Sequence, residues 1–209
     1  MQPTNGQAGA AVKLLVFDMG HVFIDFDWEA VQAGFCRASG RSSGQLRRAF
    51  AEVARLGYES GRIDSEGFLF QLNKRLGTTL SLSEFRELWT VSFHENKDMV
   101  ELFETLKQQR PLYLLSNTNE IHYEYLQSTF NVARHFQELI LSYRVGCSKP
   151  DPSIYQEVFR RSGFAAEQCL FIDDLETNVK AAAETGMQAI RFTGVDDLKM
   201  RLTSLGFTV

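Results

Sequence analysis

An uninterrupted apolar run that ends in a carboxylate constrains the fold of this chain more than any other feature. Residues 13–22 read KLLVFDMGHV, in which Leu14 to Phe17 are apolar, Asp18 follows, and Gly20 comes two residues later. Such a run is typical of a strand that is buried on both faces of a parallel sheet. We therefore expect this segment to deliver Asp18 to the rim of a sheet, where it is a candidate nucleophile.

Three further apolar runs lead into polar residues of the kinds that phosphoryl chemistry uses. In chain order, residues 112–115 are followed by Ser116, Asn117 and Thr118, residues 139–141 by Lys149 and Pro150, and residues 169–172 by Asp173 and Asp174. Ligands of an open parallel sheet bind outside the carboxyl ends of its strands. We expect these separate positions to converge on one crevice with Asp18.

The segment between the first two runs has a different pattern, because its apolar residues recur at helical spacing. Helices are predicted over residues 28–38, 43–56, 65–76 and 81–93, the last with a cap-like Ser-Leu-Ser-Glu start at Ser81. The core of this insert is predicted to contain its phenylalanines, Phe35, Phe50, Phe68, Phe70 and Phe85. Just before it, residues 22–27 alternate apolar and acidic side chains, which favours a short hairpin or flap beside the site.

Helices and strands alternate from residue 96 onward. Helices are predicted over residues 99–109, 120–130, 152–162, 175–185 and 195–205, and strands over 112–115, 139–141, 169–172 and 188–192. This alternation implies a parallel sheet with right-handed crossovers. We therefore predict an α/β fold in two parts: residues 1–26 and 95–209 form the α/β core domain, and residues 27–94 form the inserted helical domain.

The four polar motifs, in this order, are also the motifs of a known family. The chain resembles the haloacid dehalogenase-like (HAD) hydrolase superfamily, in which the matching residues are Asp18 and Val22 in the opening motif, Ser116, Lys149, and the final acid pair. The resemblance covers nearly the whole chain. It implies a Rossmann-like parallel sheet with the helical insert as a mobile cap, and a magnesium-dependent phosphatase that works through an aspartyl phosphate on Asp18.

The acid pair is the expected metal site. Successive side chains at a strand end point to opposite sides, so one of Asp173 and Asp174 is expected to face Asp18 and to share a divalent cation with it. A few hard oxygen ligands, completed by phosphate and water, describe a Mg²⁺ site. The resemblance assigns the direct ligand to Asp174, places Asp173 behind it, and adds the backbone carbonyl of Gly20.

The phosphate group is expected to be held by Ser116, Asn117 and Lys149. Ser116 and the neighbouring donors at Asn117 can bind phosphate oxygens, and the charge of Lys149 can hold both the nucleophile and the transferring group. Family members use the matching Ser and Lys in these roles. Asn178 lies four residues after Asp174 on the same face of the predicted helix, and we expect it to orient Lys149.

One position departs from the family pattern. Most phosphatases of the family carry a second Asp two residues after the nucleophile, which protonates the leaving oxygen and later activates water, and this chain has Gly20 there. General acid–base catalysis typically contributes about 10²–10⁴-fold in rate. The candidates for its replacement are His21, Asp25, Glu59 and a metal-bound water. The chain is similar to a branch with an Asp-x-Gly opening that includes sugar-phosphate phosphatases, which implies a small phosphate monoester, such as a sugar phosphate, as substrate.

Two alternatives to a phosphatase remain. A metal-independent 2-haloacid dehalogenase of the same fold also lacks the second Asp, but it typically carries Ser-Ser-Asn where this chain has Asp173 and Asp174. A non-catalytic relative that binds phosphometabolites is the other alternative, and the intact Asp18 and Lys149 weigh against it. The acid pair favours the phosphatase.

Composition and charge indicate which kinds of partner and which cellular location to expect for this chain. A net charge of −4 without a basic cluster argues against nucleic-acid binding. Cys36, Cys147 and Cys169 are too far apart for a disulfide frame or a zinc site, which favours a reducing cytoplasm. No apolar run approaches membrane-spanning length, and residues 1–9 are polar and are expected to form a loose tail. No feature of the sequence indicates an oligomeric state, and the expected partner is a small phosphate ester.

Overall fold

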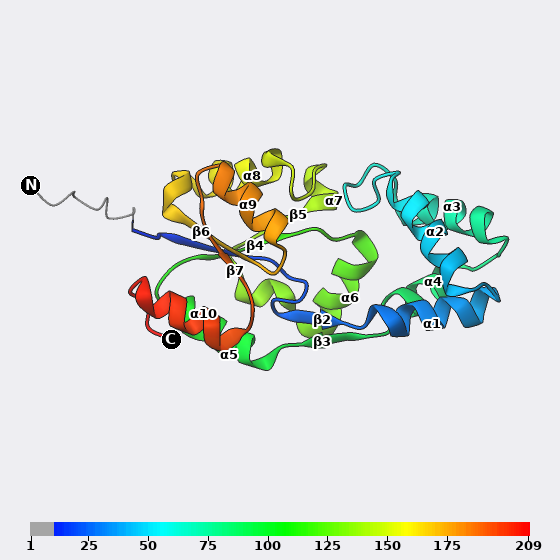
Figure 1. Ribbon diagram of the computed structural model, residues 1–209, viewed down its shortest axis with the longest axis horizontal. Coiled ribbons are helices and arrows are strands. Elements are labelled where there is room, and N and C mark those ends of the chain that lie inside the picture. The colour runs from blue at the N-terminus through cyan, green and yellow to red at the C-terminus, as the bar shows by residue number, and fades with distance from the viewer. Residues whose placement is uncertain (1–10) are drawn as a thin grey trace, which may run out of the picture.

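A five-stranded parallel sheet forms the middle of the larger domain. The computed structural model describes residues 11–209, so the tail predicted at residues 1–9 lies outside the described residues. The strand order is β5-β4-β1-β6-β7 (Figure 1). These strands are β1 (Leu14–Phe17), β4 (Leu112–Ser116), β5 (Glu138–Leu141), β6 (Cys169–Asp173) and β7 (Gln188–Arg191). Because β1 pairs with β4 on one side and with β6 on the other, the residues that follow these three strands are neighbours at one edge.

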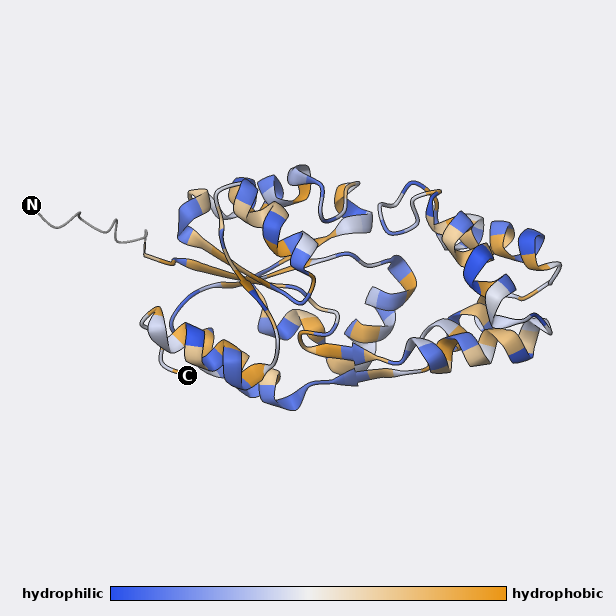
Figure 2. Ribbon diagram, in the orientation of Figure 1, coloured by the Kyte–Doolittle hydropathy of each residue, from blue (hydrophilic) through white to orange (hydrophobic). Residues whose placement is uncertain are grey.

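Helices cover both faces of the sheet, as the unbroken apolar run of β1 requires. Leu14 and Val16 pack in one buried cluster with α8 (Pro152–Ser162) and α9 (Glu176–Glu184). Leu15 and Phe17 pack in a second cluster with α5 (Lys97–Leu106), α6 (Glu120–Phe130) and α10 (Val195–Ser204). Figure 2 shows the strands between these layers as largely hydrophobic. The α/β class and the parallel sheet predicted from the sequence are therefore confirmed.

The insert is a separate bundle with its own core. Its helices are α1 (Trp28–Ser39), α2 (Ser43–Ala54), α3 (Ser65–Leu76) and α4 (Leu82–Trp89). Ser81 begins α4 with the expected capping box, in which the Ser81 N–H donates to Glu84 Oε2 at 2.8 Å. The bundle core holds Phe35, Phe50 and Phe85, and Ile121 of α6 joins it from the other domain.

Two predictions within the insert are wrong. The fourth helix ends at Trp89 rather than at residue 93, because Phe93–Glu95 forms β3, which pairs antiparallel with β2 (Ile24–Phe26). The flap expected at residues 22–27 therefore finds its partner strand almost seventy residues later. Phe70 is not in the core but 65% exposed, because the buried stripe of α3 runs through positions 68, 69, 72 and 76.

Smaller differences concern the element ends. Helix α2 stops at Ala54 rather than at residue 56, and α5 covers Lys97–Leu106 rather than residues 99–109. The sequence also did not predict the short helices α7 (Ser142–Val145), η1 (Val132–His135) and η2 (Ala166–Gln168). None of the helices within residues 11–209 has the length and hydropathy of a membrane-spanning segment.

Candidate active site

Asp18 lies where β1 ends, at the edge that the ends of β4 and β6 share. Its backbone N–H donates to the carbonyl of Ile172 at 2.9 Å, which continues the ladder with β6 and fixes its position. The residue is 8% exposed. Burial raises the pKa of Asp18 to about 6, while Lys149 opposes that shift and Asp173 adds to it. The carboxylate therefore depends on nearby positive charge to stay ionised.

Lys149 bridges two of the predicted acids. Its Nζ lies 2.6 Å from Asp18 Oδ1 and 2.7 Å from Asp173 Oδ2, and the residue is 4% exposed. Burial lowers the pKa of Lys149, but the two carboxylates outweigh it, so the pKa is raised above its ordinary value. Asn117 holds the backbone of Lys149, because its Oδ1 accepts from the Lys149 N–H and its Nδ2 donates to the Lys149 carbonyl, both at 2.8 Å.

Asp173 is the last residue of β6 and Asp174 follows it, and the two side chains lie in different environments. Asp173 is fully buried and accepts from Lys149, from the Leu175 N–H at 2.8 Å, and from Asn178 Nδ2 at 3.0 and 3.1 Å. Asn178 therefore reaches Lys149 through Asp173, because its amide contacts the carboxylate that accepts from the Lys149 ammonium group. Asp174 is half-buried, and burial followed by the charge of Asp173 raises its pKa.

The three carboxylates fit a divalent cation. Asp18, Asp173 and Asp174 each offer one oxygen, and these oxygens lie within 4.8 Å of one another. Carboxylate oxygens are the hard ligands that Mg²⁺ prefers. Gly20 lies two residues beyond Asp18 in a tight turn, in which Met19 O accepts from the Phe23 and Ile24 N–H groups. The cluster therefore contains two of the predicted ligands, Asp18 and Asp174, together with Asp173, which was expected behind Asp174.

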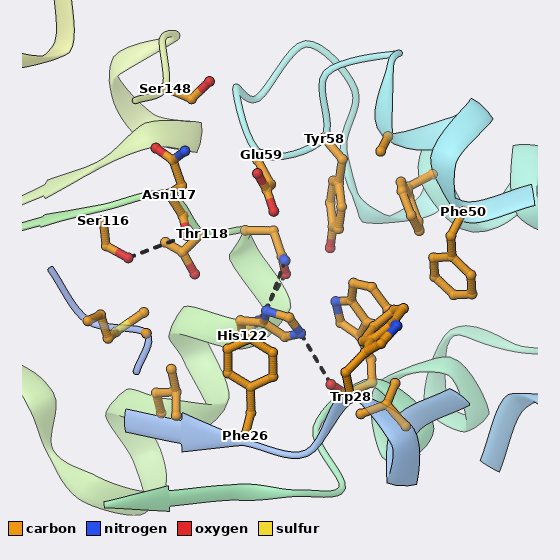
Figure 3. Close-up of a pocket in the computed structure, with 18 of the residues that line it drawn as sticks. Phe26, Trp28, Phe50, Tyr58, Glu59, Ser116, Asn117, Thr118, His122 and Ser148 are labelled. Atoms are coloured by element: carbon orange, nitrogen blue, oxygen red, sulfur yellow. Dashed lines mark hydrogen bonds between the residues drawn. The ribbon is translucent and has the colours of Figure 1, made fainter. Parts of the chain in front are cut away.

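Ser116 ends β4, the strand that pairs with β1, and Asn117 follows it, so both lie at the same edge of the sheet as Asp18. Ser116 is 1% exposed, and its hydroxyl has one weak contact, to the carbonyl of Asn117 at 3.4 Å. Both residues line a cavity of about 730 Å³ that extends from this edge into the insert (Figure 3). A hydroxyl held only weakly is available to donate to a phosphate oxygen.

The three side chains among the candidates for the missing acid occupy different places. His21 and Asp25 pair with each other, with Nδ1 and Oδ1 3.7 Å apart, and both side chains are about half exposed. Glu59 comes from the loop at residues 57–61 of the insert, and Figure 3 shows its side chain pointing into the cavity. Glu59 is exposed to solvent at the mouth of the cavity, desolvation by the surrounding residues raises its pKa, and Lys149 opposes that shift. Of the three, Glu59 is therefore the carboxyl that faces the cavity.

The loop that carries Glu59 is docked on the core domain. The Ser142 hydroxyl donates to the Glu59 carbonyl at 2.5 Å and accepts from the Thr118 N–H at 2.9 Å. Gly61 has φ +67° and approaches so closely that a Cβ there would lie 2.2 Å from the Tyr143 carbonyl oxygen. These contacts fix the loop above the ends of β4 and β5.

His122 is a cavity residue that the sequence analysis missed. Its Nε2 lies 3.1 Å from the Trp89 carbonyl, which can only accept, so Nε2 carries the proton and Nδ1 accepts from Asn119 at 3.1 Å. Burial lowers the pKa of His122 to about 4, so the ring is neutral. It joins α6 to the end of α4 rather than acting as a base, and no motif in the sequence marks such a contact.

Comparison with known proteins places these features in context. The model of the haloacid dehalogenase-like hydrolase family matches residues 12–186. Curated relatives include D-ribitol-5-phosphate phosphatase of Bacteroides thetaiotaomicron, which is 26% identical over 92% of this chain and 97% of its own. Flavin mononucleotide hydrolase 1 of Arabidopsis thaliana is 28% identical over 95% of this chain and 79% of its own.

Solved structures agree with the fold. A HAD family enzyme from Bacteroides thetaiotaomicron, 26% identical, superimposes with a TM-score of 0.83 over 92% of this chain and 98% of its own. The same enzyme in complex with magnesium and inorganic phosphate has a TM-score of 0.76 over 87% of this chain and 94% of its own. An L-2-haloacid dehalogenase from Xanthobacter autotrophicus, 21% identical, has a TM-score of 0.64 over 92% of this chain and 83% of its own, and shares the fold.

Proposed function

The chain belongs to the haloacid dehalogenase-like hydrolase family and is a magnesium-dependent phosphatase, and we propose that Asp18 is the nucleophile with which it cleaves phosphate monoesters. The observation that carries this role is the position of Lys149 between Asp18 and Asp173, next to Asp174. The positive charge of the Lys149 ammonium group favours the ionised form of Asp18, although that carboxylate is buried. The dehalogenase and the non-catalytic alternatives are not favoured.

The proposed reaction has two displacements. Asp18 attacks phosphorus, the bond from phosphorus to the ester oxygen breaks, and the phosphoryl group is held on Asp18 until water releases it as inorganic phosphate. Ser116, Asn117 and Lys149 bind and orient the phosphate oxygens. Bound Mg²⁺, held by Asp18, Asp174 and the Gly20 carbonyl, supplies positive charge against the charge of the phosphate group. Asp173 and Asn178 position Lys149, because Asn178 binds the carboxylate that Lys149 contacts.

Glu59 is the proposed proton donor to the leaving oxygen. Its side chain enters the cavity that Ser116 and Asn117 line, and its loop is held there through Ser142. The raised pKa keeps more of this carboxyl protonated than a glutamate at its ordinary pKa would be. His21 and Asp25 pair with each other instead. A donor on the insert means that proton transfer requires the insert to be closed over the site.

The Glu59→Gln variant is expected to lose activity according to the leaving group. Hydrolysis of alkyl phosphates should fall about 10²-fold or more, while p-nitrophenyl phosphate, whose leaving group needs no proton, should change little. The measurement is log kcat/KM against leaving-group pKa, which should have a steeper slope in the variant. Glu87→Gln, an exposed glutamate on α4 of the same insert, serves as the control.

A second substitution, at Gly20, tests the proton-donor role of Glu59 by restoring an acid at the position where most family members have one. A Cβ on Gly20 would meet Phe26 at 3.6 Å, an ordinary contact, so a side chain can start at this position without a clash. Gly20→Asp in the Glu59→Gln background should flatten the slope again. Equal slopes for Glu59→Gln and the unchanged enzyme would show that another group supplies the proton.

Removal of the cation is expected to abolish the phosphatase. Excess chelator should stop hydrolysis of p-nitrophenyl phosphate, added Mg²⁺ should restore it, and Asp174→Asn should lose about 10²-fold or more and need more Mg²⁺. Asp98→Asn, an exposed acid on α5, should behave like the unchanged enzyme. Full activity in chelator, or chelator-resistant release of chloride from 2-chloropropionate, would contradict this function.

The remaining assignments are also proposals. We propose that residues 1–26 and 95–209 form the catalytic core, of which residues 11–26 and 95–209 are described, and that residues 27–94 form a cap that opens and closes over the crevice. The separate buried clusters of the two parts support this division. The three free cysteines are consistent with a cytoplasmic location, and the net charge of −4 with a small phosphate ester rather than nucleic acid as the partner.

A further inference from the structure

The cavity beside Asp18 is one continuous space with two different ends. At the core end it is lined by Gly20, Ser116 and Asn117, and at the cap end by Phe50, Phe68 and Trp89 (Figure 3). Its volume of about 730 Å³ lies in the range of small-molecule sites. A phosphate group that is bound at the core end therefore directs the rest of its ester into the cap end.

Aromatic rings form the walls of the cap end. Phe50 and Trp89 lie nearly parallel, 6° between their planes and 5.1 Å between their centroids. Trp28 stands edge-on to both rings at 5.8 Å, and 38% of its surface remains exposed. Trp28 lines the cavity, so an apolar group bound there can cover part of its exposed surface, which is favourable, whereas Phe50 and Trp89 are only 7% and 8% exposed.

The polar groups of the cap end are mostly occupied by other protein groups. The Ser65 hydroxyl donates to Glu120 at 2.8 Å, so the Tyr58 hydroxyl donates to Ser65, 2.9 Å away. The Ser92 hydroxyl exchanges hydrogen bonds with the backbone of Asp27.

Few polar groups at this end are left for a ligand. Both ring nitrogens of His122 are paired. Among the described residues, the Trp89 indole N–H and, nearer the core end, the Thr118 hydroxyl are buried without a partner, and Arg47 is exposed at the lining. A polyol with a hydroxyl on every carbon would lose most of its hydrogen bonds to water in such a space.

We propose that the substrate is a phosphate monoester of an alcohol with a bulky apolar body, and that this body fills the cap end of the cavity. The inference rests on the phosphatase function proposed above and names the leaving group that the function requires. In this proposal the residues of the core end bind the phosphate group and cleave the ester bond. Trp28, Phe50 and Trp89 of the cap end determine which leaving groups are accepted.

The test compares primary phosphate monoesters whose leaving groups have nearly equal reactivity. For n-alkyl phosphates of four, six, eight and ten carbons, kcat/KM should rise about two- to fourfold per added methylene until the cavity is full. Pentyl phosphate should be cleaved at least about tenfold better than ribitol 5-phosphate, which has the same number of carbons. The hydroxyl groups of ribitol make its leaving oxygen the more acidic, so intrinsic reactivity would favour the opposite order.

A pair of matched variants locates the effect. Ala51 of α2 lines the cavity, whereas Ala33 of α1 is exposed and lies outside it. Ala51→Trp should lower the ratio of kcat/KM for decyl over butyl phosphate at least about tenfold, and Ala33→Trp should leave that ratio unchanged. Circular dichroism and thermal unfolding check both variants, and Ala54→Leu, at a second lining alanine, replaces Ala51→Trp if that variant does not fold.

The outcomes separate the two proposals. A series that is flat with chain length, a preference for ribitol 5-phosphate, or an unchanged ratio in the folded Ala51 or Ala54 variant would overturn the apolar leaving group and leave the phosphatase intact. Absence of magnesium-dependent hydrolysis for every ester, p-nitrophenyl phosphate included, would overturn the phosphatase itself.

Discussion

Asp18→Asn is expected to abolish turnover while the protein still folds. An amide oxygen is a far poorer nucleophile than a carboxylate, and loss of a covalent nucleophile typically lowers kcat by about 10⁴-fold or more. The amide has nearly the same shape, and Lys149 keeps Asp173 as a partner at 2.7 Å. The measurements are kcat with p-nitrophenyl phosphate and Mg²⁺, and thermal unfolding of the variant.

Covalent trapping gives an independent readout of the same residue. Beryllium fluoride mimics a phosphoryl group, so it should form an adduct on Asp18 in the unchanged enzyme and none in Asp18→Asn. Asp98→Asn, which removes an exposed carboxylate outside the site, should keep both activity and adduct. An Asp18→Asn protein that is folded and active would rule out covalent catalysis through this residue.

Lys149→Met is expected to lose both activity and stability. Without the ammonium group, Asp18 and Asp173 remain buried next to each other with no positive partner. Breaking a buried ion pair in this way typically costs about 3–5 kcal/mol of unfolding free energy. Activity should fall at least about 10³-fold, because the phosphate group and its nucleophile lose the same charge.

Urea unfolding in chelator measures the stability change, with Lys180→Met as the matched control. Lys180 pairs with Glu176 at 3.0 Å, but its side chain is 69% exposed, so its removal should have little effect on stability. If the two variants unfold at the same urea concentration, the buried bridge does not stabilise the fold.

The core of the candidate site follows from the sequence because parallel strands end at one edge. Asp18, Ser116 and Asp173 each follow an apolar run. Because β1 pairs directly with β4 and β6, a parallel sheet is sufficient to bring these three residues together. The role of Asn178 was harder to predict. Its spacing from Asp174 gives the face of the helix but not which neighbour its amide contacts, and that neighbour is Asp173.

Features that join distant segments were not predictable from local patterns. Residues 93–95 read Phe-His-Glu shortly after α4 ends at Trp89, and only pairing with the backbone of β2, almost seventy residues earlier, makes them a strand. The aromatic lining of the cavity by Trp28, Phe50 and Trp89 was unpredictable for the same reason. Phe50 was expected in the core of the insert, and the same ring also lines the cavity, because Trp28, Phe50 and Trp89 come from different helices.

The ribbon of β2 and β3 makes the cap an exchangeable module. Both crossings of the chain between the domains pass through this ribbon, in which Phe26 and Phe93 are paired residues. Paired positions of antiparallel strands lie only about 5 Å apart, so a short turn can span them. A gene rearrangement that replaces everything between these two residues would exchange the proposed substrate pocket and the proposed proton donor Glu59 together, and would leave Asp18 and the cation site untouched. Such an exchange would change the leaving group and the residue that protonates it in one step, while the attack on phosphorus stays with the core.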